Sequence, residues 1–206
     1  MGIEKVDTTT EEKIKEAAKT IFHKKGFAAT RTRDIAEEAN INLALLNYYF
    51  RSKKRLFEII MLETISNFVH SMAETMNNQN TSLEDKITIM TSNYIDFIIK
   101  EPNIPIFMLN EIRNNSDEII NRLSVMDLIV DSEFFKQFQE AVSSGKISQP
   151  NPFHFLMNLW SLIIFPFLGK PLLVGLSNMS DKEFNLLMLE RKSLIPLWID
   201  TLLKTT

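Results

Sequence analysis

The sequence predicts an all-α protein. Residues that favour helices, chiefly Leu, Ile, Met, Glu and Lys, dominate the chain, and glycine occurs only five times in 206 residues. The alternating runs of Val and Thr that are typical of strands are scarce. Apolar residues recur instead at intervals of three and four, which is the period of a helix with one buried face. We therefore expect about nine helices.

The first expected helix spans residues 8–25. Thr8 and Thr9 each stand three positions before a glutamate, which is the pattern of a capping box. Gly26 is expected to end the helix, because glycine readily adopts the left-handed conformation of a C-cap. The apolar stripe of this helix consists of Ile14, Ala17, Ala18, Ile21 and Phe22.

Two shorter helices follow, at residues 32–39 and around residues 42–50. Small alanines in the first of them allow close helix contact, and Asn40 and Ile41 form the turn between the two. Asn42 is expected to cap the second helix, since its amide oxygen can accept from the free backbone N–H groups of the next turn. Two short helices joined by such a turn describe a helix-turn-helix, whose second helix enters the major groove of DNA.

The second short helix has an unusual outer face. Leu46 and Phe50 lie four positions apart and are expected to point inward. Asn47, Tyr48 and Tyr49 lie between them and are expected to point outward. A basic turn follows, formed by Arg51, Lys53, Lys54 and Arg55. This combination suits a helix whose outer face meets base edges while its flank meets phosphates.

The charge distribution agrees with a DNA-binding end. The net charge of −3 argues against a protein that coats DNA through bulk positive charge. Residues 1–60, however, carry 12 Lys and Arg against 9 Asp and Glu, whereas the remaining 146 residues carry 11 against 17. A mildly positive head on an acidic body can direct one end of the protein toward DNA.

The next expected helix starts near Ser52 and continues to residue 76, and the remaining ones span residues 81–100, 104–112, 116–145, 153–165 and 181–203. Thr81 and Ser82 begin capping boxes, and Gly145 is expected to close the helix before it. We expect two domains, residues 1–55 and 56–206. The division falls inside a helix that starts near Ser52, and such a rigid connection can transmit a shift from one domain to the other.

The stretch from Ile147 to Gly169 carries no formal charge, which raises the alternative of a transmembrane helix. Prolines at positions 150, 152, 166 and 171 cut the stretch into a helix of about thirteen residues, shorter than the roughly 20 that a membrane requires. A buried or interface helix is therefore favoured, and no membrane partner is expected.

The residue inventory offers no chemistry for an enzyme. Cysteine is absent, and the three histidines, at positions 23, 70 and 154, do not stand in metal-ligand spacing. Neither a glycine-rich phosphate loop nor a Gly-x-Ser-x-Gly motif occurs. We therefore expect no catalytic residue, no metal and no cofactor. No apolar segment follows Met1, so a cytoplasmic location is the expectation.

The N-terminal quarter of the chain resembles the DNA-binding domain of TetR-family (tetracycline-repressor-like) transcriptional regulators. Asn40 stands where glycine is frequent in that family, Asn47 where tyrosine is frequent, and Leu43 where a small or polar residue is common. Asn40 tolerates a left-handed turn, so the fold is kept, whereas the other two bear on the operator sequence. The matching positions are Ile14, Ala17, Ala18, Phe22, Gly26, Phe27, Thr30, Ile35, Ala36, Ala39, Leu46, Phe50, Lys53 and Leu56.

The resemblance implies roles for the residues of the helix-turn-helix. Thr32 would bind a phosphate with help from the helix dipole, and Arg33 occupies a position that often reaches a base. Tyr49 and Lys53 would meet the DNA backbone. The residues expected to face the groove are Asn42, Leu43, Ala44, Asn47 and Tyr48.

The resemblance also implies that the body binds a ligand and forms a homodimer through its last two long helices, here residues 153–165 and 184–203. Trp160 and Trp198 are candidate interface anchors, and the alternative that both lie in the core of each subunit stays open. Eleven of the fifteen phenylalanines and nine of the ten methionines lie beyond residue 57, and these can enclose a cavity for a hydrophobic or amphipathic small molecule. The candidate lining residues are Phe68, Met72, Phe97, Phe107, Met108, Glu111 and Phe138.

Three functions compete. The leading hypothesis is a ligand-responsive regulator, most simply a repressor, that binds a near-palindromic operator in double-stranded DNA. The second is a protein-interaction module whose helix-turn-helix does not contact DNA. The third is a small-molecule carrier or helical-bundle enzyme, which requires a polar constellation that the sequence lacks.

Overall fold

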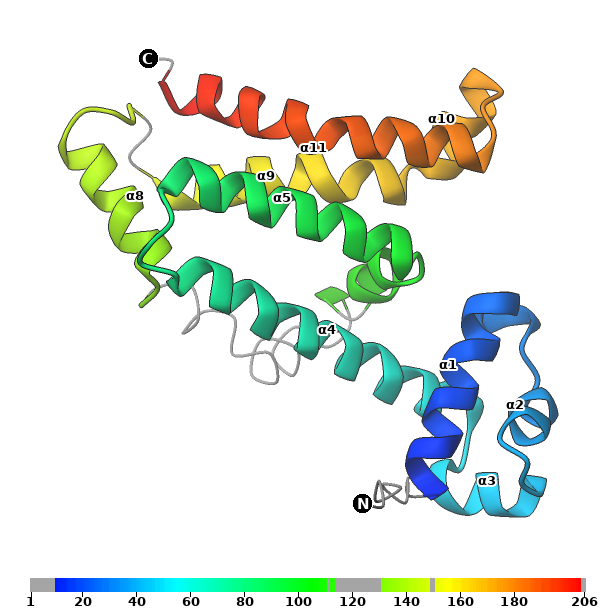
Figure 1. Ribbon diagram of the computed structural model, residues 1–206. Coiled ribbons are helices and arrows are strands. Elements are labelled where there is room, and N and C mark those ends of the chain that lie inside the picture. The colour runs from blue at the N-terminus through cyan, green and yellow to red at the C-terminus, as the bar shows by residue number, and fades with distance from the viewer. Residues whose placement is uncertain (1–9, 111, 114–130, 149–150, 205–206) are drawn as a thin grey trace, which may run out of the picture. The chain divides into compact units, whose positions relative to one another are not determined.

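Helices are the only regular secondary structure in the part of the chain that the computed structural model describes (Figure 1). That part comprises residues 10–110, 112–113, 131–148 and 151–204, with His23 described by its backbone only. The chain divides into two compact units, Met1–Ile65 and Ser66–Thr206. The division falls inside one continuous helix, α4 (Lys53–Asn77). The prediction of an all-α fold is confirmed.

The first unit contains α1 (Thr10–Ala29), α2 (Thr32–Glu38), α3 (Leu43–Phe50) and the beginning of α4. α2 packs against both α1 and α3. The predicted stripe of α1 is buried, and it meets the inward-facing side chains of the other helices. The least exposed apolar residues of this unit are Ile14, Ala18, Phe22, Ile35, Leu46 and Leu56.

Local backbone signals in the first unit agree with the predictions. Asn40 has a φ of 52°, so the turn between α2 and α3 uses the left-handed conformation that asparagine tolerates. Gly26 has a φ of 73° and interrupts α1, although one more helical turn follows to Ala29. The predicted capping residues Thr8 and Thr9 lie outside the described residues.

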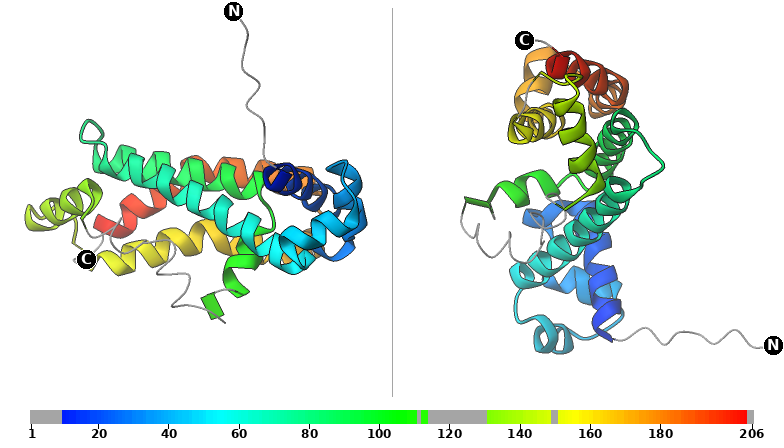
Figure 2. Two further views of the ribbon diagram at one scale, coloured as in Figure 1. Left: turned by 90° about the horizontal axis from the view of Figure 1, so that it is seen from below. Right: turned by 90° about the vertical axis from the view of Figure 1, so that its left-hand side faces the viewer.

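The second unit contains the rest of α4, α5 (Leu83–Lys100), a helical segment at residues 104–110, α8 (Glu133–Ser143), α9 (Pro152–Leu168), α10 (Lys170–Ser177) and α11 (Asp181–Lys204). α11 packs alongside both α5 and α9, and α10 packs against α9 and α11 (Figures 1 and 2). Ser82 caps α5 as predicted, since its Oγ accepts from the N–H of Asp85 at 3.0 Å.

Three predictions for the second unit require correction. The expected long helix at 116–145 is not continuous, because Ser132 is extended and its Oγ caps a new helix at Glu133. Residues 114–130 lie outside the described part. α9 extends past Phe165 to Leu168 with Pro166 inside it, and α10 was not expected.

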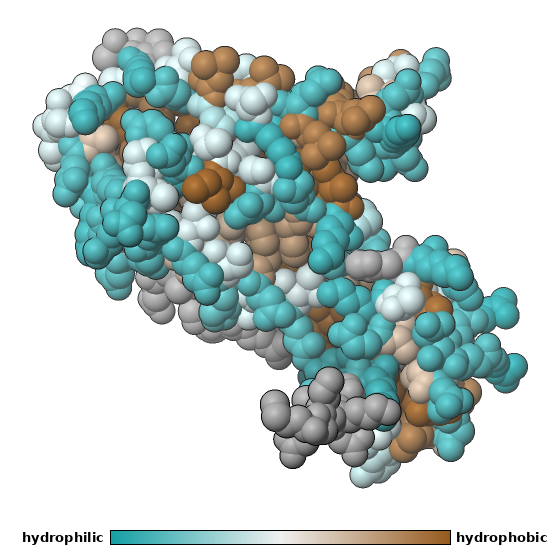
Figure 3. All heavy atoms as spheres, in the orientation of Figure 1, coloured by the Kyte–Doolittle hydropathy of each residue, from teal (hydrophilic) through white to brown (hydrophobic). Residues whose placement is uncertain are grey.

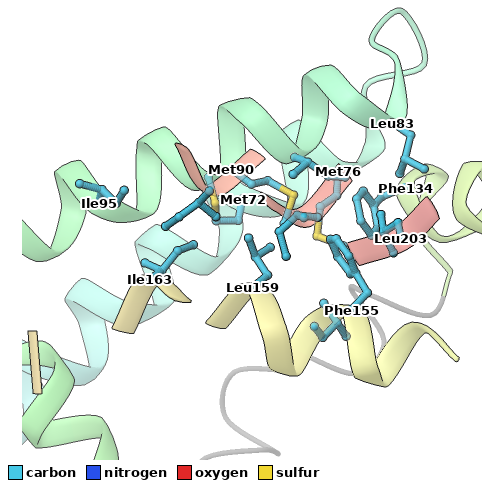
Figure 4. Close-up of a cluster of buried hydrophobic side chains, with 14 of the residues drawn as sticks. Met72, Met76, Leu83, Met90, Ile95, Phe134, Phe155, Leu159, Ile163 and Leu203 are labelled. Atoms are coloured by element: carbon cyan, nitrogen blue, oxygen red, sulfur yellow. The ribbon is translucent and has the colours of Figure 1, made fainter. Parts of the chain in front are cut away.

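The core of the second unit is rich in methionine (Figure 4). Met72, Met76 and Met90 lie among Leu159, Ile163 and other apolar side chains of α4, α5 and α9. Unbranched thioether side chains fill irregular spaces and can rearrange at low cost. The core of this unit is therefore more adaptable than one built from Leu and Ile alone.

No single described helix is both long and apolar enough to cross a membrane. α9 and α10 reach the necessary length and hydropathy only when they are counted together, and the two are bent by 62° at their break. On the single chain, several α9 side chains are each more than a third exposed. The other face of the same helix is buried in the core.

A lysine is completely buried in the second unit. The Lys86 ammonium donates to the carbonyls of Asn78 and Thr81 at 2.6 and 2.7 Å and to Oε1 of Gln137 at 3.0 Å. The Gln137 amide in turn donates to Thr81 O. Burial lowers the pKa of Lys86 below its ordinary value, while nearby Glu133 opposes that shift. These bonds join the turn between α4 and α5 to α8.

Lys86→Met is expected to lower the free energy of unfolding by about 1–3 kcal/mol, because three oxygen acceptors lose a charged donor and the carbonyls of Asn78 and Thr81 keep only a neutral one. The measurement is a urea unfolding curve, with a lower midpoint and an unchanged slope. Lys182→Met, at an exposed lysine of α11, is the matched control and should change stability by less than about 0.5 kcal/mol. Equal stability of the two variants would contradict this role of Lys86.

Candidate nucleic-acid interface

α3 presents polar and aromatic side chains to solvent because two apolar residues fix its orientation. Leu46 and Phe50 are 0% and 3% exposed, as the sequence predicted. Tyr48 is 80% exposed, and Asn47 and Tyr49 are also exposed. The Tyr48 and Tyr49 rings meet edge to face with centroids 5.5 Å apart. An exposed tyrosine pair of this kind is free to contact another molecule.

The first turn of α3 is fixed by its cap. Oδ1 of Asn42 accepts from the N–H of Leu45 at 2.8 Å, so the predicted N-cap is confirmed. Leu43 and Ala44 follow and are exposed. The structure therefore places all five residues expected to face the groove, Asn42, Leu43, Ala44, Asn47 and Tyr48, on α3 or at its cap and in contact with solvent.

The N-terminus of α2 is capped by the carboxylate of Asp34, a residue in the first turn of the same helix. Oδ2 of Asp34 accepts from the backbone N–H of Arg31 at 3.0 Å and pairs with Lys25 at 3.0 Å. The Arg31 bond, followed by the Lys25 interaction, holds the pKa of Asp34 below its ordinary value. Thr32 is half-buried and Arg33 is exposed, and no described group accepts from their backbone N–H groups. Those two donors remain available for a phosphate.

Lys53 has partners within the protein. Its ammonium donates to the carbonyls of Phe27 and Thr30, both at 2.8 Å, and lies 4.4 Å from the centroid of the Phe27 ring. These contacts hold the end of α1 to the start of α4. A lysine has three donors, so two are occupied, and the predicted phosphate contact would rely on the third.

The exposed cations of the basic turn are Arg51, Lys54 and Arg55. Arg51 has a φ of 57°, which is uncommon for a residue with a side chain, and it ends α3. Lys54 is 3.6 Å from Glu58, a long surface ion pair. The sequence marked the whole turn as basic, but it contained no sign that Lys53 rather than a neighbour would bind backbone carbonyls.

Four of the candidate ligand-binding residues belong to the apolar core of the second unit: Met72 and Phe138 lie in it, and Phe68 and Phe97 pack against it. Phe68 of α4 stacks on Phe97 of α5, with ring centroids 4.0 Å apart, and Tyr94 meets Phe68 edge to face. Burial raises the pKa of Tyr94 to about 12. Phe138 instead packs near Phe155 of α9, at 5.6 Å.

The other candidates differ in exposure. Met72 and Phe107 are buried, and Met108 is half-buried. Glu111 lies outside the described residues. The lining of a cavity thus stays a prediction. Among the described residues, no three His, Asp or Glu side chains gather in a way that could hold a metal ion.

Comparison with known proteins shows which proteins this chain is similar to. The family model described as "Bacterial regulatory proteins, tetR family" matches residues 14–60. The probable HTH-type transcriptional regulator YttP of Bacillus subtilis (strain 168) is 26% identical over 163 residues, 78% of this chain and 78% of that protein. The uncharacterized HTH-type regulator YvkB of the same organism is 38% identical over 58 residues, 28% of this chain and 31% of that protein.

Solved structures share the fold over nearly the whole chain. The transcriptional regulator FadR from Bacillus subtilis, in complex with stearoyl-CoA, has a TM-score of 0.62 at 14% identity over 92% of this chain and 97% of that one. A TetR/AcrR-family regulator from Thermobifida fusca has a TM-score of 0.64 at 17% identity over 90% and 96%. At these identities, the likeness concerns the fold.

Lys53→Met is expected to destabilise the first unit by about 1–2 kcal/mol, because two carbonyls lose a charged donor. Amide hydrogen exchange of α1 and α3 measures the change as faster exchange. Lys54→Met is the control, since its surface pair with Glu58 contributes at most about 0.5 kcal/mol. If both variants exchange like the unmodified protein, Lys53 does not hold α1 to α4.

Proposed function

We propose that the chain is a member of the tetR family of bacterial regulatory proteins, and that it is a ligand-responsive repressor that binds a near-palindromic operator as a homodimer. DNA binding and transcription regulation follow from the family. Repression, the symmetry of the operator and the effector are proposals for this chain. In this proposal residues 1–55 bind DNA, and residues 56–206 bind the effector and the second copy.

The observation that carries the proposal is the outer face of α3. A short helix, capped by Asn42 and anchored by Leu46 and Phe50, exposes Asn47 and Tyr48 in a helix-turn-helix. Asparagine can bond both N6 and N7 of adenine in the major groove, and the other exposed side chains can contact thymine methyl groups. An anchored helix holds these groups in one orientation, which sequence discrimination requires.

Contacts to phosphates would come from the flanks of α3. The free backbone N–H groups of Thr32 and Arg33, at the start of α2, suit a phosphate. The hydroxyl of Tyr49 can donate a hydrogen bond to another phosphate. In the basic turn we assign the main electrostatic contacts to Arg51, Lys54 and Arg55, with the remaining donor of Lys53 in addition.

Exposed apolar side chains on α9 and α11 support the homodimer. Figure 3 shows apolar patches, in brown, among polar ones near the top of the view, where α11 runs. Trp160 and Trp198 are 38% and 37% exposed on the single chain, so neither lies in its core. Large apolar residues that gather on one exposed face mark an interaction site, whereas singly scattered ones are ordinary. The further exposed apolar residues of these helices include Phe153, Met157, Phe165, Leu187, Leu194, Leu197 and Leu202.

The proposed effector is a hydrophobic or amphipathic small molecule. The methionine-rich core around Met72, Met76 and Met90 can adapt to a guest. In FadR, which shares the fold, the bound molecule is stearoyl-CoA. For a tenfold loss of DNA affinity, the effector must bind the DNA-free form more tightly by about 1.4 kcal/mol. α4 continues without a break from one unit into the other, and it provides the covalent route for such coupling.

Two alternatives have weaker support. An interaction module without DNA binding would not require the exposed Asn47 and Tyr48 beside a basic turn. A carrier or a helical-bundle enzyme would require a polar constellation in the body. An electrophoretic mobility shift with DNA from upstream of the protein's own reading frame separates both alternatives from the repressor.

Asn47→Ala and Tyr48→Ala are expected to change which operator sequences are preferred, by about 1–3 kcal/mol for each lost base contact. Lys54→Ala is the control, because the loss of a phosphate contact weakens all sequences equally and lowers the salt dependence of binding. Selection from a randomised operator library measures both effects. A uniform loss of affinity in the Asn47 and Tyr48 variants would contradict the assigned reading face.

Trp160→Glu and Trp198→Glu are expected to dissociate the dimer, since a carboxylate would be buried at its centre without a partner. Sedimentation velocity at micromolar concentration measures the change. Ile106→Glu, at an apolar residue 52% exposed outside α9 and α11, is the matched control and should remain dimeric. A dimer that survives in both tryptophan variants would exclude this face.

A further inference from the structure

α9 contains a proline that breaks its own hydrogen-bond pattern. Pro166 has no backbone N–H, so the carbonyl of Leu162, four residues earlier, lacks its helical donor. The guanidinium of Arg191, on α11, supplies one instead, since its Nη2 donates to Leu162 O at 2.8 Å. A side chain of α11 thus takes the place of a backbone bond of α9.

The same guanidinium supports a tryptophan of the exposed face. Its central carbon lies 5.1 Å from the centroid of the Trp198 ring, and the two groups form a cation–π contact. Nε of Arg191 is buried and has no hydrogen-bond partner among the described residues. No described carboxylate pairs with Arg191, and burial lowers its pKa below the ordinary value. The positive charge of Arg191 is therefore stabilised by one carbonyl and one aromatic ring.

Arg191 lies on the side of α11 that carries exposed apolar residues. Helical spacing of three and four aligns it with Leu187, Leu194, Trp198 and Leu202. A guanidinium is weakly hydrated and stacks on aromatic rings, so it can be covered by another molecule more easily than an ammonium can. Arg191 is suited to lie beneath an interface.

We propose that Arg191 is a positioning residue for self-association, which joins α9 to α11 at the carbonyl freed by Pro166 and fixes Trp198 for contact with a second copy of this chain. This inference rests on the proposed homodimer. In this inference the bond from Arg191 to the carbonyl that Pro166 leaves free holds α9 and α11 together as one surface before the second copy binds.

The test is a double-mutant cycle. Arg191→Met removes the donors but keeps the apolar stem, and Pro166→Ala returns an N–H to α9, which can then satisfy Leu162 O within the helix. Dimer dissociation constants are measured with Trp160 in place, and the unsubstituted protein is the reference. The emission of Trp198 is measured in a parallel set that carries Trp160→Phe, so that Trp198 is the single tryptophan. Dimer dissociation constants and the emission of Trp198 are measured for all four members of the cycle.

Arg191→Met is expected to weaken the dimer about tenfold, equivalent to about 1.4 kcal/mol, and to shift the emission of Trp198. In the Pro166→Ala background the same substitution should weaken it less than about threefold, because Leu162 O no longer depends on Arg191. Lys192→Met is the matched control, since the neighbouring cation pairs with Asp96 of α5 instead, at 2.6 Å, and dimerisation should be unchanged.

Each outcome decides between the two claims. An unsubstituted protein that is monomeric at micromolar concentration would contradict the homodimer and this inference together. A dimeric reference with an equal loss for Arg191→Met in both backgrounds, or no loss in either, would contradict the inference alone. If Arg191→Met fails to fold in the reference background but folds in the Pro166→Ala background, the rescue itself supports the coupling. Failure to fold in both backgrounds would contradict it.

Discussion

The four-residue spacing of Leu46 and Phe50 is the constraint on which the DNA-binding surface depends. α3 has only eight residues and is too short to be stable alone, so packing must hold it in place. With these two side chains buried, the period of the helix leaves Asn47, Tyr48 and Tyr49 in solvent. The orientation of the outer face is therefore a consequence of the core.

Polar bonds at the ends of the helices complete this anchoring. Asn42 fixes the start of α3, and Asp34 fixes the start of α2 through the N–H of Arg31. Lys53 binds two carbonyls near the interruption of α1 at Gly26. Each bond satisfies backbone groups that a helix end leaves free, and together they limit how far α3 can move.

The second unit uses the same principle. Lys86 satisfies carbonyls of the turn between α4 and α5, and Arg191 satisfies a carbonyl that Pro166 leaves free in α9. Long cationic side chains thus replace backbone donors where the helical pattern fails. One of these cations, Arg191, joins the two helices that carry the exposed apolar residues, α9 and α11.

Local signals explain what the sequence could predict. The caps at Asn42 and Ser82 and the left-handed turn at Asn40 depend on residues within three or four positions, and the structure agrees with them. The errors have non-local or ambiguous causes. Ser132 can stand inside a helix or cap one, and the tolerance of α9 for Pro166 depends on an arginine far along the chain. The partners of Lys53 lie more than twenty residues away, so its role could not be distinguished from that of Lys54.

The central claim is that the outer face of α3 reads bases in the major groove. Methylation interference with dimethyl sulfate on a selected operator tests it directly, because the reagent methylates guanine N7 in the major groove and adenine N3 in the minor groove. We predict that guanine methylation blocks binding at two clusters related by two-fold symmetry. Interference confined to adenine methylation, or none at either base, would contradict the claim.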